Sequence, residues 1–148
     1  MEAFRGRYFH TVDPKGRLSI PSKFRDVLKN RYDEGLIVAH FDRCLVAYPE
    51  EEWTRLEEKL LQLPSTQLEV RTFLRRFFSS GVDCPVDKQG RVLLPPESRR
   101  SAGIMKDVVL VGLMNRFELW SRERWQEFIE SSADSFETMS DKLANLGI

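Results

Sequence analysis

The chain has 148 residues, 23 of them basic and 23 acidic, so its formal net charge is zero. That length can bury one core, or two small cores that are marginal alone and gain from packing together. The cysteines, Cys44 and Cys84, stand apart and exclude a disulfide framework or a Cys-x-x-Cys zinc site. No apolar run approaches a membrane span and no signal-peptide pattern opens the chain, so we expect a soluble, unprocessed protein of the reducing cytosol.

The first segment predicts two strand pairs separated by a short helix. In Pro14-Lys15-Gly16 the glycine can take a positive φ, which favours a tight turn between strands. Pro21 suits the first position of a helix, and Asp42-Arg43 suits the turn of a second hairpin. We expect strands over 7–13, 17–20, 36–41 and 44–48, and a helix over 22–30.

Two helices are expected next. The first spans 50–63, carries an apolar stripe and ends at Pro64. The stripe consists of Trp53, Leu56 and Leu60. Thr66-x-x-Glu69 matches a capping box and predicts that the second helix begins there and ends at Gly81.

The rest of the chain repeats the first plan. Strands are expected over 82–87, 91–94, 108–113 and 117–120, with a helix from Pro96. Helices are expected over 122–131 and 136–146. The last of these has few apolar residues, so we expect contact with another subunit to order it.

A motif that occurs twice explains this repetition. Residues 12–21 return as 86–95, with Val, Asp, Gly, Arg and Pro in register at an offset of 74, as Asp13 and Asp87 show. Arg25 and Arg99 extend the register. Two repeats are too few for a solenoid but suffice for a pseudo-symmetric pair of half-domains.

Charge is unevenly distributed along the chain. Residues 1–31 contain eight basic and three acidic residues, and the remainder carries the compensating negative charge. A phosphate backbone responds to local potential rather than net charge. The first repeat is therefore a basic pole on a neutral molecule.

Each Asp-x-x-x-Arg motif has two interpretations. In the structural one, the carboxylate of Asp13 accepts loop N–H groups and pairs with Arg17, which stiffens the turn. In the binding one, the pair presents Lys15 and Arg17 to phosphates or base edges. Both can hold, because a buttressed arginine is pre-organised. In the second loop Gln89 stands at the position that Lys15 occupies in the first. The cation of the second loop, Lys88, lies one position earlier.

Other polar residues point to no catalytic site. His10 and His40 belong to none of the hydrolase, metalloprotease or phosphate-loop motifs. Cys44 lies in a predicted hairpin beside apolar residues, which is typical of a buried, inert thiol. Arg71, Arg75 and Arg76 favour a solvated face or an interface. We therefore expect no enzyme activity, no cofactor and no metal.

The sequence also resembles the MraZ family of bacterial transcriptional regulators over nearly the whole chain. The resemblance rests on the following segments: Phe4-Arg5-Gly6, the block over 13–21, Asp87-x-x-Gly90-Arg91, Leu110-Val111-Gly112 and Phe117-Glu118-Leu119-Trp120. It implies an α+β fold, a tandem duplicated swapped-hairpin β-barrel of AbrB/SpoVT type with peripheral helices. The implied parts are a first half over 1–64, a connecting helix over 65–81 and a second half over 82–148.

The resemblance further implies a ring-shaped homo-oligomer in the cytoplasm, associated with the nucleoid. Such a ring binds short direct repeats in double-stranded DNA upstream of its own operon, the division and cell-wall cluster, and usually represses it. The implied DNA-binding residues are Arg5, Lys15, Arg17, Lys88 and Arg91. The implied structural residues of the motifs are Asp13, Gly16, Asp87 and Gly90.

One alternative of another class stays open. The loops and the surface of an oligomer could form a non-enzymatic protein–protein module that recruits a partner encoded nearby. DNA binding through several basic loops weakens steeply with ionic strength, whereas a mainly apolar protein interface does not. Salt dependence therefore separates the two.

Overall fold

The computed structural model describes residues 2–148. Its first half contains β1 (Arg7–Thr11), β2 (Arg17–Ser19), α1 (Ser22–Arg31), β3 (Leu36–Phe41), β4 (Cys44–Pro49), α2 (Glu50–Leu60) and α3 (Leu68–Ser79). Its second half contains β5 (Val82–Asp83), β6 (Arg91–Leu93), α4 (Pro96–Ala102), β7 (Asp107–Gly112), β8 (Phe117–Ser121), α5 (Arg122–Ser131) and α6 (Ala133–Ala144). The expected mixture of helices and antiparallel strands is confirmed.

The two repeats exchange strands. A six-stranded sheet runs in the order β1-β7-β8-β4-β3-β5, and a separate two-stranded sheet joins β2 to β6. Strand β1 begins the first repeat and pairs with β7 of the second. Strand β5 begins the second repeat and pairs with β3 of the first. The order therefore reads the same from either end, which is the pseudo-symmetry that the duplication predicts. These pairings form one open sheet and one ladder, not a single closed barrel.

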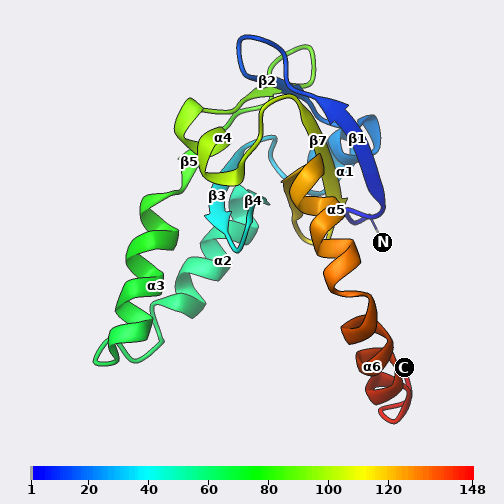
Figure 1. The fold of residues 1–148 in the computed structure, drawn as a ribbon. Helices are drawn as coiled ribbons and strands as arrows, with labels where there is room; N and C mark the ends of the chain where they lie inside the picture. The colour runs from blue at the N-terminus through cyan, green and yellow to red at the C-terminus, as the bar shows by residue number, and fades with distance from the viewer. Residues whose placement is uncertain (1) are drawn as a thin grey trace.

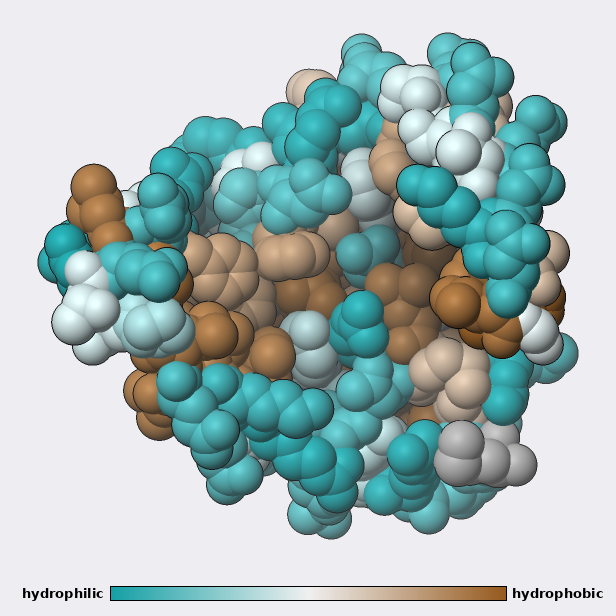
Figure 2. Space-filling model, turned by 90° about the horizontal axis from the view of Figure 1, so that it is seen from below, coloured by the Kyte–Doolittle hydropathy of each residue, from teal (hydrophilic) through white to brown (hydrophobic). Residues whose placement is uncertain are grey.

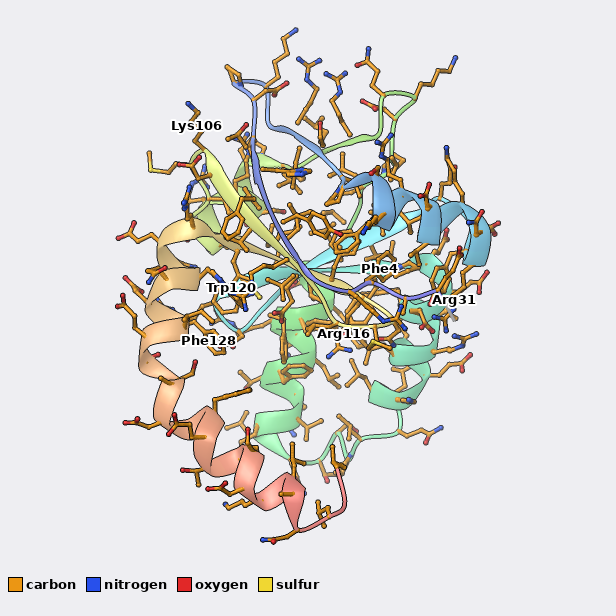
Figure 3. All side chains as sticks on the ribbon, turned by 90° about the vertical axis from the view of Figure 1, so that its right-hand side faces the viewer. Phe4, Arg31, Lys106, Arg116, Trp120 and Phe128 are labelled. Carbon is orange, nitrogen blue, oxygen red and sulfur yellow. The ribbon has the colours of Figure 1, made fainter. Side chains whose placement is uncertain are left out.

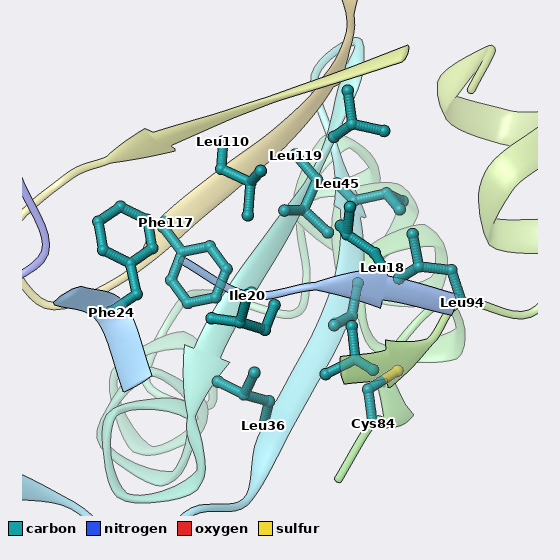
Figure 4. Close-up of a cluster of buried hydrophobic side chains, with 14 of the residues drawn as sticks. Leu18, Ile20, Phe24, Leu36, Leu45, Cys84, Leu94, Leu110, Phe117 and Leu119 are labelled. Atoms are coloured by element: carbon teal, nitrogen blue, oxygen red, sulfur yellow. The ribbon is translucent and has the colours of Figure 1, made fainter. Parts of the chain in front are cut away.

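The main core lies between the six-stranded sheet, the β2–β6 ladder and α1. Leu18 and Val92 face each other across that ladder and are buried, whereas their neighbours Ser19 and Leu93 are exposed. This alternation follows from the two-residue period of a strand. Figure 4 shows Leu18 and Leu94 in the same buried cluster as Phe117 and Leu119 of β8.

Two helical arms extend from the end of the molecule opposite the β2–β6 ladder (Figure 1). In the arm formed by α2 and α3, Trp53 stacks on Phe77, with ring centroids 5.2 Å apart. In the arm formed by α5 and α6, Trp125 packs edge-on against Trp120 at 5.5 Å. The apolar stripe expected on the first connecting helix therefore packs, through Trp53, against the second. Within residues 2–148, every helix is too short or too polar to span a membrane.

The predicted start of the second connecting helix was wrong. Helix α3 begins at Leu68, and its N-cap residue is Gln67, which makes no side-chain cap bond. The turn after Pro64 continues through Thr66, because the Gln67 N–H donates to the Pro64 carbonyl at 3.2 Å. Arg71 holds this turn by donating to the carbonyls of Ser65 and Thr66 at 2.9 and 3.0 Å. Helix α6 likewise begins at Ala133, three residues before the predicted start.

Candidate nucleic-acid interface

The loop between β1 and β2 is organised around the carboxylate of Asp13. One oxygen, Oδ1, accepts the backbone N–H groups of Lys15 and Arg17, both at 2.9 Å. The other oxygen, Oδ2, accepts Nε–H of Arg17 at 2.6 Å. Gly16 closes the turn by donating to the Asp13 carbonyl, with a φ of 90° that favours glycine. The structural interpretation of Asp13 and Gly16 therefore has a direct geometric basis.

The loop between β5 and β6 repeats this geometry. Asp87 Oδ1 accepts the backbone N–H groups of Gln89 and Arg91, both at 2.9 Å. Its Oδ2 accepts Nε–H of Arg91 at 3.2 Å. Gly90 has a φ of 77° and donates to the Asp87 carbonyl. Two copies of one sequence motif thus fold into two copies of one loop.

These hydrogen bonds favour the ionised form of both aspartates. The pKa of Asp13 lies below its ordinary value, first because the backbone N–H of Arg17 bonds to its ionised form. The pKa of Asp87 is lowered in the same way by the backbone N–H of Arg91. Each arginine uses Nε for its aspartate, and within residues 2–148 its terminal Nη groups form no hydrogen bond. An oriented guanidinium with unoccupied donors is suited to bidentate binding of phosphate or guanine.

The two loops lie side by side because each is bonded to the other repeat. The Ile20 N–H donates to the Gly90 carbonyl, and the Leu94 N–H donates to the Gly16 carbonyl, both at 2.9 Å. Both loops form the end of the molecule opposite the helical arms, where side chains with terminal nitrogens project outward (Figures 1 and 3). The end therefore presents a pair of loops as one surface.

Most of the predicted DNA-binding residues gather at this end. Lys15 and Lys88 are exposed in the loops, and Arg17 and Arg91 begin β2 and β6 with partly exposed side chains. Arg5 is also exposed, but it precedes β1, beside the bridge between Phe4 and Met114. The first loop follows the end of β1, whereas Arg5 precedes its start, so the two lie at opposite ends of this strand.

The structure adds cations that the sequence analysis did not place here. Lys106 is exposed, and its carbonyl accepts the Val12 N–H at 2.8 Å, next to the first loop (Figure 3). Arg99 packs over Gly16, and Arg25 packs over Gly90, each crossing to the other repeat. The shared offset of Arg25 and Arg99 was the available signal, but sequence alone does not show that they cross.

The other candidate residues lie elsewhere. Arg71, Arg75 and Arg76 belong to α3, in the arm opposite the loops. Cys44 and Cys84 are both buried and free, and burial raises the pKa of Cys84 to about 11. The expectation that Cys44 is buried is confirmed. Burial lowers the pKa of His40, and Arg76 adds to that effect.

Comparison with known proteins assigns the family. The family described as "MraZ protein, putative antitoxin-like" matches residues 3–76 and again 77–146. The chain belongs to the MraZ family. It is 46% identical to the transcriptional regulator MraZ of Desulfitobacterium hafniense strain Y51, over 98% of this chain and 99% of the relative. It is 41% identical to that of Syntrophobacter fumaroxidans, over 98% and 97%.

Further relatives agree with this assignment. The transcriptional regulator MraZ of Clostridium beijerinckii is 45% identical, over 98% of this chain and 99% of the relative. The two MraZ matches meet within α3, so each covers one repeat of the strand plan. The resemblance inferred from the duplicated motif is therefore confirmed.

Proposed function

We propose that this protein is a non-enzymatic, sequence-specific regulator of transcription that binds double-stranded DNA through its paired loops. The observation that carries the proposal is the pair of Asp-buttressed loops at one end, each with a lysine at its tip and an oriented arginine. Relatives named as transcriptional regulators support it. In this proposal Lys15, Lys88 and Lys106 contact phosphates, and Arg17 and Arg91 reach base edges. Arg5 binds DNA only where the duplex continues past β1.

We further propose that several chains form a ring through their helical arms. Helix α6 contains no buried residue and exposes Phe136 and Met139, which are 73% and 52% accessible. Beside the α2–α3 arm lies a hollow of about 160 Å³ whose lining includes four aromatic side chains, Phe41, Tyr48, Phe73 and Phe77. Figure 2 shows hydrophobic residues gathered in the hollow face between the arms. Docking of α6 onto the α3 arm of a second copy covers both apolar surfaces.

Charge supports this head-to-tail contact. Helix α6 has three acidic residues and one basic residue, whereas α3 has three basic residues and one acidic residue. The acidic residues of α6 are Asp134, Glu137 and Asp141, and the basic residues of α3 are Arg71, Arg75 and Arg76. A contact between different surfaces of identical chains generates a ring when its rotation closes.

The proposed ring explains how weak loops achieve specificity. One chain makes few phosphate contacts and has no net charge, so its own affinity for DNA is low. A ring that places successive loop pairs on direct repeats raises the effective concentration of each later contact. The proposed site is a set of direct repeats upstream of the protein's own operon, the division and cell-wall cluster. Occupancy of such a promoter site blocks polymerase, so the proposed effect is repression at the nucleoid.

The fold belongs to the same proposal. We infer that the halves over 1–64 and 82–148, with 65–81 between them, act as one pseudo-dimeric unit of swapped-hairpin AbrB/SpoVT type. Strand exchange between the repeats supports this, because β1 pairs with β7 and β5 with β3. In that arrangement both loops depend on both halves, so neither half binds DNA alone.

Replacing Arg17 tests the proposed DNA-binding surface. We expect Arg17→Ala to abolish the operator shift, because each engaged loop loses a base contact worth about 1–3 kcal/mol and the losses add around the ring. The measurement is an electrophoretic mobility shift beside size-exclusion chromatography of the same sample. Lys59→Ala, on α2 and away from the loops, is the control. A normal shift with an intact oligomer would show that this loop does not bind the operator.

A further inference from the structure

A cavity separates helix α1 of the first repeat from the loop of the second repeat. Its volume is about 180 Å³. It is lined by Arg25, Leu28, Lys29, Glu34, Val86, Asp87, Lys88 and Gly90. Its wall therefore joins two repeats, and a ligand there would contact the base of the second loop.

Arg25 is the unusual member of this wall. Its guanidinium lies so close to Gly90 that a Cβ on that glycine would be 2.5 Å from Nη1. Its Nε is buried and has no hydrogen-bond partner. A buried donor without an acceptor is destabilising, because its bond to water is lost and not replaced.

The other repeat shows what Arg25 lacks. Arg99 occupies the corresponding position over Gly16, and its Nε donates to the Leu94 carbonyl at 3.1 Å. Leu94 corresponds to Ile20 in the first repeat, but Arg25 makes no such bond to Ile20. The two arginines therefore differ in spite of the duplication: one is satisfied by its own repeat, and the other borders a cavity with its Nε unsatisfied.

The charges around the cavity favour an anion. Within residues 2–148, the side chains of Arg25, Lys29 and Lys88 form no ion pair and no hydrogen bond. Asp87 is already neutralised by Arg91 and by two loop N–H groups. Glu34 alone opposes the three cations, which leaves an excess of about two positive charges, the complement of a dianion.

We propose that this cavity is a binding site for a phosphate group, held by Arg25, Lys29 and Lys88. The volume excludes larger ligands, because sites for drug-sized molecules span about 300–1,000 Å³. The phosphate can be free, as the dianion of inorganic phosphate or of a small phosphate monoester, or it can be a DNA backbone phosphodiester, which carries one negative charge. Only the second source depends on the function proposed above.

Isothermal titration calorimetry tests whether the site binds free phosphate. The full chain is titrated with inorganic phosphate, and chloride keeps the ionic strength constant. We expect saturable binding of one phosphate per chain, weakened about tenfold by Lys29→Gln, since one charge-assisted hydrogen bond is lost. Glu34→Gln should tighten binding, because it removes the opposing charge. Lys23→Gln, on an exposed part of the same helix, should leave it unchanged. Because these residues are exposed, the variants keep the fold, which thermal unfolding verifies.

The salt dependence of operator binding tests whether the bound phosphate belongs to the DNA backbone. If Lys29→Gln lowers the salt dependence of operator binding by about one phosphate contact while free phosphate does not bind, the ligand is the DNA backbone. If free phosphate binds with the expected variant pattern, the site stands even where Arg17→Ala leaves the operator shift intact. The proposal would be overturned if free phosphate does not bind and Lys29→Gln leaves the salt dependence unchanged. It would also be overturned if phosphate binds equally well to the Lys29→Gln and Glu34→Gln variants and to the natural chain.

Discussion

At the residue scale, Asp13 holds its loop more strongly in the ionised form than in the protonated form. Its pKa is lowered in the folded protein, so it stabilises the fold above its unfolded pKa of about 4 and loses that contribution as the pH falls through the folded value. We expect Asp13→Asn to be less stable than the natural chain near neutral pH, and the difference to shrink below about pH 4. Urea unfolding of both proteins across this range measures it. A difference that stays constant with pH would contradict an ionic role.

Gly112 is limited by close approach rather than by its φ. A Cβ there would lie 2.5 Å from the backbone atoms of Phe4 and Arg5, which cannot rotate away. We expect Gly112→Ala to destabilise the protein by about 1–3 kcal/mol through overpacking. Lys142→Ala is the control, because this side chain is exposed on α6. Equal unfolding midpoints for the two variants would show that the segment before β1 packs loosely on β7.

At the element scale, local signals predicted most strands, but not their partners. The turn at Gly16 and the alternation around Leu18 need only neighbouring residues, so both could be predicted. The pairing of β1 with β7 joins residues about a hundred positions apart, and no local pattern encodes it. The crossing of Arg25 onto Gly90 follows from the pairing of β2 with β6, which is also non-local, so it could not be predicted either. The Thr66 capping box failed because a proline turn competed for the same residues.

Helix α6 is expected to serve assembly rather than folding. None of its residues is buried within the chain, so Phe136→Ser should leave the unfolding transition of the chain nearly unchanged. The same substitution removes an aromatic anchor from the proposed contact with α3, and we expect the particle mass to fall. Light scattering after size exclusion measures the mass, and Ser140→Ala on the same helix is the control. An unaltered mass would place the subunit contact on another surface.

At the scale of the whole molecule, the loops at one end and the arms at the other divide the proposed work into binding and assembly (Figure 1). Because the chain is neutral overall, the proposed attraction to DNA comes mainly from the loop end. Loss of assembly should therefore weaken binding to several repeats far more than binding to one. A protein–protein module would show no such dependence on DNA repeats.

The salt dependence of DNA affinity reports on both the proposed phosphate contacts and the proposed assembly. Each phosphate contact steepens the fall of log affinity against log salt by about 0.9. DNA with three repeats should therefore give a slope about three times that of DNA with one, because each repeat engages another loop pair. Lys15→Ala should reduce the slope by about one for each engaged subunit. Fluorescence anisotropy over a salt series provides the slopes. Equal slopes for one and three repeats would mean that only one subunit contacts DNA, and avidity could then not supply the specificity.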